Sequence, residues 1–225
     1  MPNPSTQSTQ PAVLIDVDGT LSDSLQGIQL SFLEALKTID VTPPNQEFLD
    51  SIAGPPMVEN LARLGLDDAQ IQAASSTYYQ LQRDGGWRDT KMFELDPSWP
   101  ELLHSWREAG YTIATATSKS EYFTEKVLED FGIRQYFNVI GAASNDGSRR
   151  TKDDVITHTL ELLNHPSKAV MIGDRIHDFS GATNHGLPVI AVSWGYGSDN
   201  ERRKATATAH TGAELATLVA EQLER

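Results

Sequence analysis

The chain has 225 residues, no cysteine and a formal net charge of −13, because 31 acidic residues outweigh 18 lysines and arginines. This length allows one domain, or one domain with a modest second one. The lack of cysteine excludes disulfides, thiolate nucleophiles and cysteine-based zinc sites. The acidic charge offers no basic surface to a nucleic-acid polymer or an anionic membrane, so small metabolites or other proteins are the expected partners.

Residues 1–11 are mostly Pro, Ser, Thr, Gln and Asn. They lack the basic and apolar regions of a signal peptide, and we expect them to form a disordered tail. No window reaches the roughly 18–20 apolar residues that a membrane span requires. The sequence therefore predicts a soluble, cytoplasmic protein.

The first predicted strand is the apolar run from Ala12 to Ile15, which leads into Asp16-Val17-Asp18-Gly19-Thr20. Gly19 interrupts regular structure, so two carboxylates should stand at the carboxyl edge of a sheet, where open α/β folds bind ligands. Crowded carboxylates are stabilised by a hard divalent cation such as Mg2+. The alternative is an Asx-type turn in which they only cap backbone N–H groups.

Residues 22–94 show helical periodicity, as at Ile28, Phe32 and Leu36, and no convincing strand. We predict an all-helical insertion. Because it directly follows the first strand, it should lie above the carboxyl edge of the sheet and be able to close over a ligand. The alternative is a helical lobe that only packs there.

From Asp96 onward, helix-like and strand-like segments alternate. Repeated alternation with apolar strands predicts a parallel sheet covered on both faces, in an α/β fold with a Rossmann-like core. The expected elements are a helix over 99–109, a strand over 111–116, a helix over 120–131, a strand over 137–140, a helix over 153–163, a strand over 169–172, a helix over 179–185 and a final strand over 188–194.

Polar residues follow these strands or begin the next helices, and the sheet topology should bring them to one edge. They comprise a nucleophile, an acid or base, a hydroxyl, a cation and further metal ligands, which are the groups needed to transfer a phosphoryl group through an aspartyl-phosphate. They are Asp16, Asp18, Thr117, Lys152, Asp174 and Asp178.

Most of these residues also have a purely structural interpretation. Thr117 could cap a strand end, and Asp174 with Asp178 could form a helix N-cap and a first-turn acid. Lysines are usually solvated surface groups. The candidates for the cation are Lys119, Lys152 and Lys168.

Other hydrolytic chemistries lack their motifs. The six histidines form no HxH or HExxH pattern, which disfavours a zinc hydrolase. There is no GxxxxGK[ST] phosphate loop and no GxSxG elbow, so a P-loop NTPase and a serine hydrolase are disfavoured as well.

Four short segments resemble the four motifs of the haloacid dehalogenase superfamily, and they follow one another in the same order along the chain. They are DxDGT at 16–20, Thr117, Lys152 and GDxxxD at 173–178. The insertion between the first two motifs resembles the small helical C1 cap of some members. Further segments resemble the phosphoglycolate phosphatase-like subgroup: Gly54-Pro55-Pro56, Ala116-Thr117-Ser118-Lys119, Asp146-Gly147-Ser148-Arg149 and Gly173-Asp174-Arg175.

The resemblance implies roles for the two aspartates after the first strand. Asp16 would attack phosphorus, with its second carboxylate oxygen on Mg2+. Asp18 would protonate the leaving oxygen and later activate water, and its backbone carbonyl would also contact the metal. An acid at position 18 suits a phosphomonoester, because the leaving alkoxide needs a proton.

The other motif residues would bind phosphate or metal. The Thr117 hydroxyl and the backbone N–H of Ser118 would hydrogen-bond the phosphoryl group, and Lys152 would neutralise the phosphate and the nucleophile. Asp174 would ligate Mg2+. Asp178 would help through a bound water or by orienting the lysine.

The resemblance also implies a domain division, with a core of residues 12–21 and 95–225 and a cap of residues 22–94. Caps of this kind exclude water and read the leaving alcohol. Candidate specificity residues on the cap are Arg63, Tyr78, Tyr79, Arg83 and Lys91.

We therefore expect a Mg2+-dependent phosphatase for a small phosphorylated metabolite such as phosphoglycolate, a nucleoside monophosphate or a sugar phosphate. A phosphotransferase of mutase or kinase-like type would use the same aspartyl-phosphate chemistry, and a non-catalytic sensor could use the site only to bind phosphate. A dehalogenase is disfavoured, because it gains nothing from Asp18, Asp174 and Asp178 together.

Overall fold

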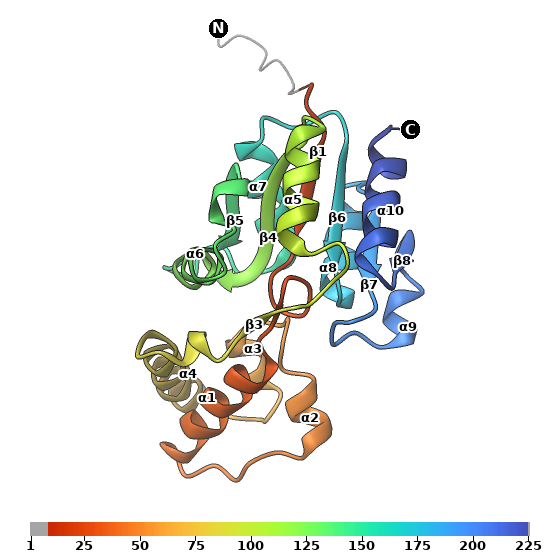
Figure 1. Ribbon diagram of the computed structural model, residues 1–225. Coiled ribbons are helices and arrows are strands. Elements are labelled where there is room, and N and C mark those ends of the chain that lie inside the picture. Colours follow the sequence, from red (N-terminus) through yellow and green to blue (C-terminus); the bar gives the residue numbers. More distant parts are fainter. Residues whose placement is uncertain (1–8, 225) are drawn as a thin grey trace, which may run out of the picture.

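The computed structural model describes residues 9–224, so most of the predicted tail, residues 1–11, lies outside the described part of the chain. The core is a six-stranded sheet of order β5-β4-β1-β6-β7-β8, and every neighbouring pair is parallel (Figure 1). The predicted α/β class is confirmed. The strands are β1 (Ala12–Ile15), β4 (Thr112–Ser120), β5 (Val139–Ala143), β6 (Ala169–Gly173), β7 (Val189–Val192) and β8 (Ala207–Ala209).

β1 lies at the centre of the sheet, between β4 and β6, and all four of its residues are buried. Alternate side chains of a strand point to opposite faces. Val13 and Ile15 enter one apolar cluster together with Trp99, and Leu14 enters a second cluster together with Phe179. Both faces are therefore covered, which explains why β1 is continuously apolar rather than alternating.

Helices on both faces supply these two clusters (Figure 1). α5, α6 and α10 pack on one face, and α7 and α8 pack on the other. The helices of the core are α5 (Trp99–Glu108), α6 (Glu121–Asp130), α7 (Lys152–Leu162), α8 (Ile176–Asn184), α9 (Asp199–Arg202) and α10 (Gly212–Glu224), with a short 3-10 turn η2 (Arg134–Tyr136).

The expected strand over 188–194 is not the final one, because β8 extends the sheet by one more strand and α10 follows it. β8 has three residues, Ala207, Thr208 and Ala209. Its alternation of alanine and threonine is short and only weakly apolar, so it does not predict a strand, and its place in the sheet comes from parallel pairing with β7.

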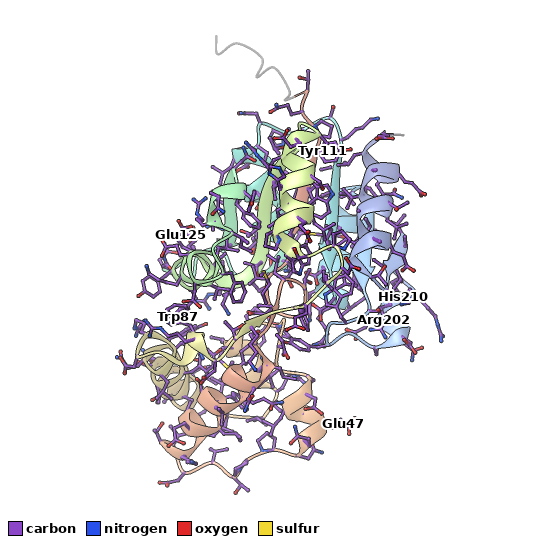
Figure 2. The ribbon with its side chains drawn as sticks, in the orientation of Figure 1. Glu47, Trp87, Tyr111, Glu125, Arg202 and His210 are labelled. Carbon is purple, nitrogen blue, oxygen red and sulfur yellow. The ribbon has the colours of Figure 1, made fainter. Side chains whose placement is uncertain are left out.

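The insertion folds into helices with an apolar cluster of their own, below the end of the sheet at which β1 stops (Figure 1). Trp87 of η1 belongs to the apolar cluster of the core, so the insertion is anchored there (Figure 2). The helices are α1 (Leu25–Lys37), α2 (Gln46–Asp50), α3 (Met57–Ala62), α4 (Asp68–Arg83) and the 3-10 turn η1 (Gly86–Arg88).

The expectation that residues 22–94 are entirely helical is wrong at the neck of the insertion. There β2 (Ser22–Asp23) pairs antiparallel with β3 (Lys91–Met92). Two residues per strand are too few to show an alternating pattern. Because this pair joins the two ends of the insertion, we propose that it marks the boundary between a cap of residues 22–94 and a core of residues 12–21 and 95–225.

Within residues 9–224, no helix is long and apolar enough to cross a membrane.

Candidate active site

Asp16 stands directly after β1 and is only 3% exposed. Its backbone N–H donates a 2.9 Å hydrogen bond to the carbonyl of Ile172, which ties the end of β1 to β6. Lys152, the first residue of α7, places its Nζ 2.8 Å from Oδ1 of Asp16. The lysine predicted for the motif therefore meets the predicted nucleophile inside the protein.

The charges around Lys152 shift the pKa of both partners. Burial raises the pKa of Asp16 to about 6, and the negative charge of Asp178 adds to this effect, while Lys152 and a hydrogen bond from Thr117 oppose it. Burial lowers the pKa of the Lys152 ammonium, but the charges of Asp16 and Asp178 outweigh burial and raise it. Lys152 is thus a permanent cation between two carboxylates.

Asp178, in the first turn of α8, holds the other side of this lysine. Its Oδ1 lies 2.7 Å from Nζ of Lys152, and its Oδ2 accepts hydrogen bonds from the backbone N–H groups of Asp174 (3.1 Å) and Arg175 (3.0 Å). A Cβ at Gly173 would lie 2.4 Å from Cγ of Asp178, so only glycine fits there. Both carboxylate oxygens of Asp178 are therefore engaged by the protein.

Asp174 follows β6 and is completely buried. Its Oδ2 accepts a 2.7 Å hydrogen bond from the backbone N–H of Tyr196, but its Oδ1 has no hydrogen-bond partner among residues 9–224. Burial raises the pKa of Asp174 well above its usual range, and the charges of Asp178 and Asp16 add to this effect. A buried carboxylate oxygen without a partner is costly unless a ligand or ion completes the site.

A divalent cation fits this arrangement. Asp16, Asp174 and Asp178 each offer one carboxylate oxygen, and these atoms lie within 4.8 Å of one another. Hard cations prefer such oxygen ligands. Because the oxygens of Asp178 are occupied by Lys152 and by backbone N–H groups, Asp16 and Asp174 have the oxygens that are freer to bind a metal ion.

The Asp18 carboxylate lies outside this trio and meets a different lysine. Nζ of Lys119 is 2.9 Å from its Oδ1 and 3.0 Å from its Oδ2, and the Ser24 hydroxyl donates a 2.7 Å hydrogen bond to Oδ1. The two aspartates after β1 therefore contact different lysines, Asp16 with Lys152 and Asp18 with Lys119.

Thr117 is buried near the end of β4 and completes the surroundings of Asp16. Its hydroxyl hydrogen-bonds Asp16 and accepts a 3.3 Å hydrogen bond from the backbone N–H of Lys119. The pairing of β4 with β5 shifts register between Thr117 and Ser120. An irregularity of this kind redirects side chains at the end of a strand, and Ser118 and Lys119 line the cavity beside the site.

These elements agree with a comparison of the whole chain with known families. The sequence model described as haloacid dehalogenase-like hydrolase matches residues 13–192, from β1 to β7. The chain belongs to the haloacid dehalogenase-like hydrolases. The matched region contains both pairs of aspartates, Thr117 and Lys152.

The relatives of this haloacid dehalogenase-like hydrolase include proteins named as a kinase and as a nucleotidase. The tyrosine-protein kinase PtkA of Mycobacterium tuberculosis is 41% identical over 89% of this chain and 68% of its own length. A protein named 5'-nucleotidase from Pseudomonas aeruginosa is 33% identical over 92% of this chain and 93% of its own length.

Solved structures show the same fold. A predicted phosphatase from Clostridium acetobutylicum superposes with a TM-score of 0.86 at 33% identity, over 95% of this chain and 100% of that protein. A putative phosphoglycolate phosphatase from Lactobacillus plantarum reaches a TM-score of 0.81 at 18% identity, over 94% of this chain and 100% of that protein, and shares the fold.

A cavity of about 590 Å3 opens beside Asp18, between the cap helices and the core of this haloacid dehalogenase-like hydrolase. Of the candidate specificity residues, Tyr78, Tyr79 and Arg83 line it. Arg63 is engaged within the cap instead: it lies 4.5 Å from the centre of the Phe48 ring and donates hydrogen bonds to Asn60 and Ser51. Lys91, in β3, is not part of the cavity wall either.

Sequence reasoning missed the contribution of Tyr196. The phenol oxygen of Tyr196 accepts hydrogen bonds from the backbone N–H groups of Ser24 (2.7 Å) and Leu25 (3.1 Å), and its hydroxyl donates one to Asp23 (3.0 Å). It therefore caps α1, whose Ser24 side chain makes no capping bond. No local pattern predicts this role, since Tyr196 and Ser24 lie far apart in the sequence.

Arg175 makes a further contact between core and cap. It donates a 2.7 Å hydrogen bond from Nη1 to the carbonyl of Ala53, in the loop before α3, and its Nε donates one of 3.2 Å to Glu201. The sequence assigned no role to this residue. Its position directly after Asp174 is the one signal in the sequence that it stands near the site.

Proposed function

We propose that this enzyme is a Mg2+-dependent phosphatase that hydrolyses a small phosphomonoester through an aspartyl-phosphate on Asp16. The observation that supports this best is the position of Asp16. It is buried at the end of β1, 2.8 Å from Lys152 and beside a buried Asp174 with one oxygen that no described residue hydrogen-bonds. The relative named 5'-nucleotidase also supports cleavage of a phosphate bond.

In the first step, an Asp16 oxygen attacks phosphorus, an O–P bond forms to Asp16, and the bond from phosphorus to the leaving oxygen breaks. Asp18, in its protonated form, gives its proton to that oxygen, so the alcohol leaves neutral. Asp18 lies at the cavity wall, two residues after Asp16, and its carboxylate is held by Lys119 and Ser24. These contacts fix its position relative to the leaving group.

In the second step, Asp18 takes a proton from water, the water oxygen attacks phosphorus, and the bond to Asp16 breaks, which releases inorganic phosphate and restores both aspartates. The Thr117 hydroxyl and the Ser118 N–H hold the phosphoryl oxygens through both steps. Lys152 stabilises the ionised Asp16 before attack and after release, and Asp178 keeps the lysine in place.

Asp16 and Asp174 would hold Mg2+, with the backbone carbonyl of Asp18 as a further oxygen ligand. When bound, the ion supplies positive charge that reduces repulsion between the carboxylate of Asp16 and the phosphoryl oxygens. Lys152 supplies a second positive charge through its contact of 2.8 Å with Asp16.

A second candidate function is phosphoryl transfer from Asp16 to an acceptor hydroxyl other than water. The 41% identity to a protein named tyrosine-protein kinase favours keeping it under test. The first step would be the same. The second would place the acceptor hydroxyl where water stands in hydrolysis, with Asp18 taking its proton.

The test is phosphate release from a panel of small phosphomonoesters with Mg2+ or with EDTA, in wild type, Asp16→Asn and the control Asp130→Asn. Asp130 lies at the exposed end of α6. We expect Mg2+-dependent release in wild type and in the control, and none in Asp16→Asn. If Asp16→Asn releases phosphate at the wild-type rate, the proposal fails. If phosphate is lost from the ester only when an acceptor alcohol is present, transfer replaces hydrolysis.

A further inference from the structure

The cavity between cap and core lies on the leaving-group side of the proposed reaction. Its wall includes Asp18, the proposed proton donor to the leaving oxygen, but not Asp16, Thr117 or Lys152. A phosphoryl group bound at Asp16 would therefore direct its ester oxygen toward Asp18 and the remainder of its alcohol into the cavity. The chemistry of the cavity wall should then match the alcohol that is released.

Aromatic rings from both parts of the protein line this cavity. Tyr78 and Tyr79 come from α4 of the cap, with their ring centres 5.3 Å apart in edge-to-face contact. Tyr122 and Phe123 come from α6 of the core, with ring centres 5.2 Å apart in the same arrangement. Edge-to-face contacts hold the rings in fixed orientations and leave their faces available to a flat ligand.

The Tyr122 side chain is unusually accessible for a large aromatic residue. It is 45% exposed, one of the few large apolar side chains of the described residues that is left accessible. Scattered surface hydrophobics need no explanation, but an aromatic side chain at the rim of a cavity beside a reaction centre is typical of a ligand site.

Arg150 provides charge on the core side. It comes from the loop before α7 and lines the cavity with Tyr79, whose pKa is raised by burial and lowered in part by the charge of Arg150. Arg150 and Tyr79 therefore line the same cavity, one from the core and one from the cap. Arginine planes and aromatic faces both stack well on flat, electron-rich rings.

We propose that the cavity is a subsite for a ring-bearing leaving group, with a nucleoside as the alcohol and its base stacked between Tyr79 and Tyr122, next to Arg150. This inference rests on the proposed phosphatase function and deepens it by assigning the substrate class. A volume of about 590 Å3 suits a ligand of nucleotide size. Phosphoglycolate would leave most of the aromatic wall in contact with water.

The test compares two esters that differ only in the base, adenosine 5'-monophosphate and ribose 5-phosphate. We expect wild type to prefer the nucleotide at least tenfold in kcat/KM, which corresponds to about 1.4 kcal/mol. Tyr79→Leu, Tyr122→Leu and Arg150→Met should each reduce this preference at least threefold. Tyr111→Leu is the matched control, because Tyr111 lies at the end of the core remote from the cap (Figure 2), and it should keep the wild-type preference.

Several results would overturn the inference. If wild type has nearly the same kcat/KM for the nucleotide and for ribose 5-phosphate, there is no subsite for the base. If all three cavity variants keep the wild-type preference, these side chains do not form the subsite. A second pair of esters, O-phosphotyrosine and O-phosphoserine, tests whether the ring of the leaving group is a phenol instead of a nucleoside base. Discrimination within that pair but not within the nucleotide pair would replace the nucleoside by a phenol.

Binding to Asp16→Asn separates failure of the subsite from failure of the proposed function. Calorimetry should show tighter binding of adenosine 5'-monophosphate than of ribose 5-phosphate, and Tyr79→Leu added to Asp16→Asn should remove the difference. If no ester is hydrolysed but this difference is present, the subsite stands and phosphatase chemistry fails. If esters are hydrolysed and the difference is absent, the subsite fails alone.

Discussion

Tyr196 and Asp174 are joined by a 2.7 Å hydrogen bond from the backbone N–H of the tyrosine to the carboxylate of the aspartate. The phenol of the same tyrosine caps α1 at the neck of the cap. One residue thus connects a proposed metal ligand with the first helix of the cap. A shift of the Asp174 carboxylate can therefore be transmitted to α1 through Tyr196 alone.

Replacing Tyr196 with Phe should lower the free energy of unfolding by about 1–2 kcal/mol, because the N–H groups of Ser24 and Leu25 lose their acceptor. Urea denaturation measures this loss. Hydrogen exchange should also become faster in the first turn of α1 than elsewhere in the cap. Tyr111→Phe serves as the control, and equal stability of Tyr196→Phe and wild type would show that the phenol does not cap this helix.

Replacing Lys152 with Met keeps most of the volume but leaves Asp16 and Asp178 buried without a cation. Breaking a buried ion pair in this way typically costs about 3–5 kcal/mol. Phosphatase activity should fall below detection, since Lys119 is held at Asp18 and cannot take over. The measurements are urea denaturation and phosphate release, with Lys204→Met as an exposed control. A Lys152→Met protein with wild-type turnover would remove Lys152 from the reaction.

Stability without metal should fall as pH rises from about 4 to about 6. The pKa of Asp16 is about 6 in the folded protein against a usual value of 3.8. Between these values the folded state binds more protons than the unfolded state, so a rise in pH favours unfolding. Asp174, whose pKa is also raised, acts in the same direction.

A bound cation opposes this loss, since it favours the ionised carboxylates. The increase in Tm caused by Mg2+, measured by thermal unfolding against EDTA, should therefore be larger at pH 7 than at pH 5. An increase of the same size at both pH values would contradict a metal site built on Asp16 and Asp174.

Replacing Asp18 with Asn removes the proton donor and later acceptor while keeping the shape of the side chain. Loss of a general acid or base typically lowers rates about 10²–10⁴-fold. With an alkyl phosphate as substrate, the rate of the first step should fall by this factor. p-Nitrophenyl phosphate, whose leaving group needs no proton, should instead give a rapid burst of nitrophenolate followed by slow turnover. Stopped-flow absorbance detects the burst, and wild-type turnover of both esters would refute the assignment.

The sequence was most informative where a strand is buried on both faces. The run Ala12–Ile15 has no other reasonable place than the middle of a parallel sheet, and the residues after it fall at the carboxyl edge as a consequence of topology. For the same reason Asp174 and Asp178 were predicted near Asp16. The roles of all these residues stay predictions until the experiments above are done.

The sequence was least informative where structure depends on partners distant in the chain. β8 and the β2–β3 pair are too short to carry a periodic pattern, and only their neighbours make them strands. The pairing of Lys119 with Asp18 depends on the redirected end of β4. Tyr196 reaches Ser24 only because the loop after β7 returns to the neck of the cap.

The central claim is that Asp16 carries the phosphoryl group during turnover. The most direct measurement is acid-quenched peptide mapping by mass spectrometry, with wild type and Asp16→Asn each mixed with Mg2+ and p-nitrophenyl phosphate for less than one turnover. The account predicts one phosphoryl group on the wild-type peptide that contains Asp16, labile to hydroxylamine, and none in the variant. A wild-type peptide that stays unmodified while product forms, or a phosphoryl group found on another residue, would contradict it.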